Sequence, residues 1–199
     1  YGKIDKWNSW KNERNLLTFA TGCVLPADKE RFLKLFDLFF TINELPELPT
    51  MISQYGIVTP AGLDYHPESA IPEESRLDSR KGFWRINPSY TSGFEAFVPI
   101  QNGCDKFCAF CAVPYTRGRE VSRPSSEILA EVSDLIMKDY KSITLLGQNV
   151  NSYGLDKNGK ELSFADLLRR IGEMGTESGK KIWVYFTSPH PRDMTREVI

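Results

Sequence analysis

Short apolar runs and amphipathic stretches alternate through residues 95–199, a pattern typical of proteins built from strands and helices in turn. Three apolar runs predict strands at Phe97–Ile100, Ile143–Leu146 and Ile182–Phe186. Between them, apolar positions recur with helical spacing after Ser125 and after Ser163, and each serine can cap its helix. The predicted apolar faces hold Ile128, Leu129, Val132, Leu135 and Ile136 in the first helix, and Leu167, Leu168, Ile171 and Met174 in the second.

Residues 1–55 show a weaker pattern of the same kind. Trp7–Asn12 is typical of the tail of a polar helix, and Leu16–Ala20 is an apolar run of strand length. Pro26–Leu35 suits a helix, since proline is favoured in a first turn. Phe36–Ile42 predicts a second strand, and the two prolines of Leu45–Pro49 predict the end of this unit.

The segment 56–92 shows neither the helical nor the strand period of apolar residues and is rich in proline, glycine and serine. This composition predicts a linker. Phe83–Ile86 predicts a short strand within it. The sequence therefore divides into an N-terminal part (1–55), a linker (56–92) and a C-terminal part (93–199).

Alternating strands and helices predict an α/β fold with a parallel sheet or barrel. The loops after the three predicted strands then meet at one edge, where such folds place their active sites. These loops are the segment after Ile100, Gly147–Gly154 and Thr187–Pro191. Three strand–helix units would be half of a six-unit barrel.

Composition and charge narrow the class of protein. Hydrophobic residues make up 41% and charged residues 26%, as in an ordinary globular chain, and the net charge of −1 gives no overall basic signature for nucleic acid. No apolar run approaches the roughly 20 residues of a membrane-spanning helix, and no signal peptide is visible. The chain starts at Tyr1 and stops at Ile199 within a predicted helix, so we expect an internal piece of a longer protein.

Three of the four cysteines, Cys104, Cys108 and Cys111, form a C-x3-C-x2-C run. Iron–sulfur clusters usually take four cysteines, so three would leave one iron open to a small molecule. The two histidines, His66 and His190, are distant in sequence and offer no neighbouring fourth ligand. A disulfide framework favours an even set in a secreted domain, and structural zinc favours four ligands in two pairs. Zinc remains the alternative.

An aromatic residue before the last cysteine, Phe110, completes a run that resembles the radical SAM superfamily. In that superfamily the open iron of a 4Fe-4S cluster chelates the amino and carboxylate groups of S-adenosylmethionine. The reduced cluster then yields a 5′-deoxyadenosyl radical. Val98–Pro124 and Leu145–Gly154 are similar to the radical SAM methylthiotransferases, in the branch that modifies tRNA.

The resemblance implies a fold and a second cluster. Residues 1–55 would be the C-terminal part of a Rossmann-like N-terminal methylthiotransferase domain, and residues 93–199 the first half of a radical SAM (β/α)6 partial barrel. The family's N-terminal domain holds an auxiliary 4Fe-4S cluster through three cysteines, and Cys23 matches the third. A buried cysteine without a ligand role is the alternative for Cys23.

By the same resemblance, the reaction adds a methylthio group to C2 of N6-isopentenyladenosine at position 37, next to the tRNA anticodon. The three clustered cysteines would hold the radical-generating cluster. Phe110 would contact the adenosine of the cofactor, and the backbone of Gly147 and Gln148 would bind its methionine amino group. The implied partners are tRNA and an electron donor such as a flavodoxin, for a cytoplasmic, monomeric enzyme without a membrane association.

A basic stretch near the cysteines offers contacts for tRNA phosphates through Lys106, Arg117, Arg119 and Arg123. The same arginines could instead pair with internal acids or with a cofactor carboxylate.

Other side chains near the predicted edge carry two interpretations each. His190 could relay a proton or simply occupy a turn. Tyr115 and Tyr153 could stack on a base or pack in the core. Asn149 and Asn151 could bind a ligand, or they could be turn residues that shape their loop.

Two other functions stay open on sequence alone. One is a ribosomal-protein aspartate methylthiotransferase of the same superfamily, and the other is a zinc-bound nucleic-acid-binding module. The stretches Arg117–Pro124 and Gly147–Asn151 favour tRNA over the ribosomal protein.

Overall fold

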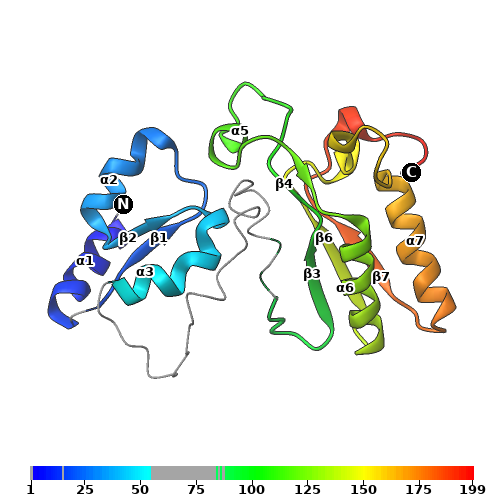
Figure 1. Ribbon diagram of the computed structural model, residues 1–199, viewed down its shortest axis with the longest axis horizontal. Coiled ribbons are helices and arrows are strands. Elements are labelled where there is room, and N and C mark those ends of the chain that lie inside the picture. The colour runs from blue at the N-terminus through cyan, green and yellow to red at the C-terminus, as the bar shows by residue number, and fades with distance from the viewer. Residues whose placement is uncertain (1, 15, 55–83, 85, 87) are drawn as a thin grey trace. The chain divides into compact units, whose positions relative to one another are not determined.

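The computed structural model describes residues 2–14, 16–54, 84, 86 and 88–199. They fall into two compact units, one within residues 1–87 and the other within 88–199 (Figure 1). Most of the predicted linker lies outside the described residues. Of the predicted strand Phe83–Ile86, only Trp84 and Ile86 are described, and neither is in a strand.

The N-terminal unit is a small α/β arrangement around two short parallel strands. Helix α1 (Gly2–Arg14) contains the predicted helix tail Trp7–Asn12 and ends two residues beyond it. Strand β1 (Phe19–Thr21) pairs in parallel with β2 (Leu38–Phe40), and between them the 3-10 turn Pro26–Asp28 leads into α2 (Lys29–Leu35), as predicted.

An ion pair and two hydrogen bonds at Asp37 connect α1 to this strand pair. Lys11 forms an ion pair with Asp37 at 2.6 Å, and Asp37 also accepts hydrogen bonds from the backbone and hydroxyl of Thr18. The buried apolar side chains described in this unit are Phe36, Leu38 and Phe40.

The predicted end of this unit at Leu45–Pro49 is wrong, because the chain continues there as helix. A 3-10 helix, η2 (Ile42–Glu47), is followed by α3 (Leu48–Gln54). Thr41 and Glu44 start η2 with a reciprocal capping box. Proline is tolerated where a backbone N–H has no partner within the helix, so a proline at the second position of α3 does not break it.

The C-terminal unit contains a three-stranded parallel sheet in the order β3-β6-β7. The strands are β3 (Glu95–Pro99), β6 (Ser142–Leu146) and β7 (Trp183–Phe186), which confirms the three predicted strands to within two residues. The central strand β6 is buried over its first four residues, as expected for a continuous apolar run inside a parallel sheet.

Two helices pack together on this sheet, α6 (Ser125–Met137) against β3 and α7 (Phe164–Glu177) against β7 (Figure 1). Ser163 caps α7 by accepting a hydrogen bond from the backbone of Asp166, as predicted. Ser125 does not cap α6, because Pro124 holds the cap position and Ser125 is already the first helical residue. The core joins both helices to the sheet through Ala96, Val98, Ile128, Val132, Leu135, Ile136, Ile143, Leu145, Leu167 and Ile171.

A second, very short sheet was not predicted. Strand β4 (Gln101–Asn102) pairs antiparallel with β5 (Val121–Ser122), so that Gln101 faces Ser122 and Asn102 faces Val121. This pair closes the base of the loop 103–120, which contains the short helix α5 (Val113–Thr116) and the three clustered cysteines. None of the described helices is both long and apolar enough to cross a membrane.

Candidate functional site

The loop that carries the three cysteines, residues 103–120, is closed tightly at its start. Gly103 has φ +81°, and a Cβ there would lie 2.2 Å from the carbonyl oxygen of Arg119. Only glycine permits this approach of the two ends of the loop. One residue further on, the backbone of Cys104 donates to the carbonyl of Gly118 at 3.2 Å. The first cysteine is therefore fixed by backbone contacts.

The three thiols of this loop differ in exposure. Cys104 is buried, Cys111 is partly buried and Cys108 is exposed, and none of them is in a disulfide. Burial raises the pKa of the Cys104 thiol, a backbone hydrogen bond from Lys106 opposes this, and the negative charge of Glu120 adds to it. Since a thiol binds metal as the thiolate, ligation at Cys104 would release this proton.

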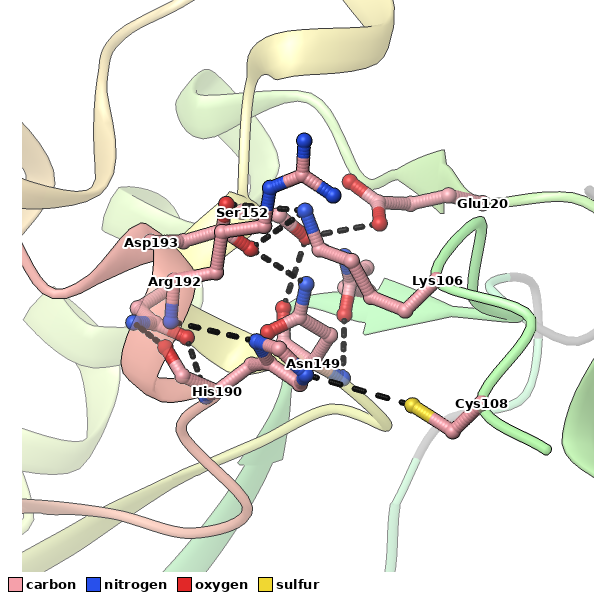
Figure 2. A network of polar contacts seen from close by, with 10 residues as sticks. Lys106, Cys108, Glu120, Asn149, Ser152, His190, Arg192 and Asp193 are labelled. Carbon is pink, nitrogen blue, oxygen red and sulfur yellow. Dashed lines mark hydrogen bonds and ion pairs between the residues drawn. The ribbon is translucent and has the colours of Figure 1, made fainter. Parts of the chain in front are cut away.

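Asp193 connects the loops that follow β3, β6 and β7 (Figure 2). It lies in the 3-10 turn η7 (Pro191–Asp193) after β7. Lys106 of the cysteine loop forms an ion pair with it at 2.6 Å, and Asn149 of the loop after β6 donates to it at 2.8 Å. Burial acts to raise the pKa of Asp193, but these two hydrogen bonds outweigh it and the pKa lies below its usual range.

A second connection joins the loops after β6 and β7 to a cysteine. The side-chain amide of Asn151 donates to the carbonyl of His190 at 2.9 Å and accepts from its backbone N–H at 2.8 Å. The His190 ring places Nε2 3.9 Å from the sulfur of Cys108. His190 does occupy a turn, as one interpretation held, but its ring also reaches the cysteine loop.

Glu120 belongs to a buried hydrogen-bond network next to these contacts. Ser152 donates to the Glu120 carboxylate at 2.6 Å, and the Gln101 amide donates to the Ser152 hydroxyl at 2.8 Å. The backbone of Asn149 in turn donates to Gln101. Burial, the largest cause, raises the pKa of Glu120 to about 7, against the lowering effect of the hydrogen bonds from Ser152 and Gln101.

The residues predicted to contact the cofactor lie at this edge. Gln148 accepts a hydrogen bond from the backbone of Gly103 at 2.6 Å, so its side chain supports the cysteine loop. Gly147 packs so closely that a Cβ would meet Gln101 Oε1 at 2.8 Å. Phe110 projects from the cysteine loop almost fully exposed, at 96%. Its ring is thus available to a ligand.

The predicted RNA contacts separate into two groups. Arg123 is largely buried and pairs with Glu127 and Glu131, at 3.4 and 2.5 Å, and Lys106 is held by Asp193. Both cations are therefore paired with acids of the same chain, which for Arg123 is the alternative that the sequence left open.

Arg119, in contrast, is exposed. It forms an ion pair with Asp105 at 2.9 Å and lies over the ring of Phe107, 5.7 Å from its centroid. Arg117 is partly buried. Tyr115 is exposed and meets Phe107 edge to face. Arg119, Phe107 and Tyr115 thus form an exposed surface that we call the aromatic–arginine surface.

Tyr153 belongs to the core. It is buried, and its hydroxyl donates to the carbonyl of Arg123 at 2.7 Å. Packing, rather than base stacking, is therefore its role in the structure.

One buried polar atom at the site has no hydrogen-bond partner among the described residues, the side-chain oxygen Oδ1 of Asn149. The amide nitrogen of the same side chain is held by Asp193, which fixes the orientation of the group. A buried acceptor without a donor is costly, so this atom suits a ligand that brings an N–H group.

The donor set fits a thiolate-bound iron–sulfur cluster better than a single metal ion. Within the part of the chain that the structure describes, no three Cys, His, Asp or Glu side chains converge to hold one ion. A cluster takes one thiolate per iron, so its ligands can be spread along a loop such as this one.

Cys23 is the remaining cysteine and lies in the N-terminal unit. It is exposed, two residues after the end of β1. The burial that the alternative interpretation expected is therefore wrong.

Sequence reasoning missed four residues that build the site: Gln101, Glu120, Ser152 and Asp193. Each acts through a partner 32 to 87 residues away in the chain. The one available signal was that each lies in a segment that follows a predicted strand, which does not identify its partner.

A parallel α/β sheet with three thiols in one loop at its carboxyl edge is the arrangement expected of a protein that binds a cofactor through thiolates. The family model of the radical SAM superfamily matches residues 98–199, which include all three cysteines, strands β6 and β7 and the end of β3. The chain belongs to the radical SAM superfamily.

Similar proteins are found along the entire chain. It is 40% identical over 205 residues to a protein of Geobacter metallireducens, and 44% identical over 211 residues to a protein of Treponema pallidum. A protein of Treponema denticola is 33% identical over 203 residues. All three are named tRNA-2-methylthio-N(6)-dimethylallyladenosine synthase. Each match covers 100% of this chain but only 43% to 45% of the relative, so the chain spans less than half of their length.

Proposed function

We propose that this chain is part of a radical SAM methylthiotransferase that adds a methylthio group to C2 of N6-isopentenyladenosine at position 37 of tRNA. The observation that carries the proposal is the cysteine loop, held at the sheet edge by contacts to both neighbouring loops. The relatives, identical at a third or more of their aligned positions, support tRNA as the substrate rather than a ribosomal protein.

The cofactors of this proposal are S-adenosylmethionine and a 4Fe-4S cluster held by Cys104, Cys108 and Cys111. When bound, the reduced cluster supplies the electron that cleaves the sulfonium bond of S-adenosylmethionine. Asn149 Oδ1, oriented by Asp193 and without a donor of its own, is placed to accept from an amino group of the ligand.

We assign the exposed ring of Phe110 to the adenosine of S-adenosylmethionine. The backbone at Gly147 and Gln148 lies beside Asn149 on the same loop, which supports a role in binding the methionine part.

For the fold, we propose that the C-terminal unit is half of a (β/α)6 partial barrel and that the N-terminal unit belongs to a Rossmann-like domain. One face of the three-stranded sheet is covered by α6 and α7. On the opposite face Phe97 and Tyr185 lie in register with Thr144 and remain about half exposed. An exposed aromatic face of this kind is what the interior of a larger barrel would cover.

The N-terminal unit supports a second cluster in the same proposal. Cys23 follows the carboxyl end of a parallel strand and is exposed, which is the placement a shared cluster ligand requires. Here it would be one of three ligands of an auxiliary 4Fe-4S cluster that presents or donates sulfur.

For tRNA, we propose contact through the aromatic–arginine surface. Exposed aromatic rings stack on unpaired bases, and an arginine beside them can pair with phosphate. The surface offers both, in Phe107, Tyr115 and Arg119. We further propose Arg117 as a phosphate contact, a flavodoxin-like protein as electron donor, and action as a cytoplasmic monomer.

The test is anaerobic reaction of the whole protein that contains this chain with S-adenosylmethionine, a reductant and tRNA bearing N6-isopentenyladenosine. Mass spectrometry should detect the 2-methylthio nucleoside and 5′-deoxyadenosine, and neither with Cys108→Ala. Modification of an aspartate in a ribosomal protein, with unmodified tRNA, would contradict the proposed substrate.

A further inference from the structure

His190 makes a side-chain contact to a cysteine that the proposed function assigns to the cluster. Its Nε2 lies 3.9 Å from the Cys108 sulfur, within hydrogen-bonding reach for sulfur (Figure 2). The two residues come from loops 82 positions apart in the sequence. The contact therefore depends on the fold and is not a local feature of the C-x3-C-x2-C run.

The position of the His190 backbone is fixed independently of its ring. It lies between Pro189 and Pro191, and its N–H and carbonyl both bond the side chain of Asn151. Asn151 is itself buried. A flanking proline on each side and a double hydrogen bond leave little freedom in the direction of the Cα–Cβ bond.

The ring is held in one tautomer. The backbone N–H of Arg192 donates to His190 Nδ1 at 3.2 Å. A backbone amide can only donate, so Nδ1 must act as the acceptor and carries no proton. In the neutral ring the proton is then on Nε2, the nitrogen that faces Cys108.

We propose that His190 is a positioning residue that donates an Nε2–H···Sγ hydrogen bond to the Cys108 thiolate and stabilises the reduced form of the cluster bound there. The inference rests on the proposed ligand role of Cys108. Outer partners of metal ligands orient those ligands, and hydrogen bonds to sulfur help to set the reduction potential of iron–sulfur clusters. Because reduction adds negative charge to the cluster and its thiolates, a donor to sulfur favours the reduced form.

The experiment is an EPR-monitored redox titration of the full chain, reconstituted anaerobically with iron and sulfide. His190→Phe keeps a ring but removes the donor, and its midpoint potential should shift to more negative values. His190→Gln can place an amide N–H near the position of Nε2, so its midpoint potential should lie close to that of the wild type. Arg192→Ala retains the backbone N–H that fixes the tautomer, so it should keep the wild-type potential.

Iron and sulfide content, measured on every variant, separates the outcomes. A His190→Phe variant with a full cluster and the wild-type potential would overturn the inference while leaving the cluster assignment intact. If His190→Phe loses the cluster, retention by His190→Gln supports the donor role, and equal loss in both overturns it. A wild-type chain that takes up no iron would contradict the proposed function itself, and this inference with it.

Discussion

The two units of the chain each place a cysteine after the end of a parallel strand, yet they surround it very differently. In the C-terminal unit the cysteine loop contacts the loops after β6 and β7 through Gln148, Asp193 and His190. Cys23 lies exposed beyond a three-residue strand, in a unit whose described buried apolar side chains are Phe36, Leu38 and Phe40. The difference shows that the spacing of cysteines alone does not describe a candidate ligand site. The side chains that hold the cysteine loop in place are part of the site as well.

The same contrast holds for packing. The C-terminal sheet and its helices share a core of fully buried side chains, whereas α2 of the N-terminal unit has none among its described residues. We therefore expect the C-terminal unit to carry most of the stability that substitutions can remove.

The largest expected effect is on this core. Leu167→Ala removes a fully buried side chain from α7 and should lower the free energy of unfolding by about 2–5 kcal/mol. Leu33→Ala, on the half-exposed surface of α2, should cost less than about 1 kcal/mol. Urea unfolding followed by circular dichroism measures both. Equal losses would contradict the contrast between the two units.

An effect of intermediate size concerns pH. The pKa of Glu120 is raised to about 7 from an ordinary value of 4.5, chiefly by burial. Between these two values the folded state binds more protons than the unfolded state, so the free energy of unfolding falls as the pH rises through this window. The fall should be on the order of 2 kcal/mol once partial solvent contact is allowed for.

Glu120→Gln should lack this fall, because an amide does not ionise. The comparison is urea unfolding of both proteins at about pH 5 and about pH 8, with Glu173→Gln as a matched exposed control on α7. If Glu120→Gln keeps the full pH dependence of the wild type, another group must be responsible.

The smallest effect tests the aromatic–arginine surface. Arg119→Ala in the whole protein should weaken tRNA binding about uniformly across sequences and reduce the slope of log affinity against log salt by about one. Arg169→Ala, similarly exposed but on α7, should leave the slope unchanged. Filter binding at several salt concentrations provides the data. Identical slopes for wild type and Arg119→Ala would remove Arg119 from the RNA contact.

The helices and strands of the C-terminal unit could be predicted because their patterns are strong. The apolar run Ile143–Leu146 gave the central strand, and Ile128, Val132, Leu135 and Ile136 gave the buried face of α6. Prolines misled the prediction in the N-terminal unit, where Pro46 and Pro49 sit within helices rather than ending them. Two-residue strands such as β4 and β5 are too short to produce a pattern.

For the candidate site, the sequence predicted the three cysteines and the sheet edge at which their loop lies. It did not predict the contacts that hold this loop in place. Cys104, Cys108 and Cys111 are recognisable because their spacing is local. The partnership of Lys106 with Asp193 spans 87 positions, and only the parallel sheet brings the two together. The partner of Arg123 could not be predicted either. The sequence of a basic stretch does not say which of its cations is buried against Glu131.

The central claim is that the cluster belongs to the loop of the C-terminal unit, and iron and sulfide analysis after anaerobic reconstitution tests it most directly. For the chain of residues 1–199 we predict about four iron and four sulfide ions bound by Cys104, Cys108 and Cys111, since each thiolate holds one iron and the fourth is left to the cofactor. Cys108→Ala should lose this cluster, while Cys23→Ala should retain it. A full, stable cluster in Cys108→Ala, or its loss in Cys23→Ala, would contradict the account.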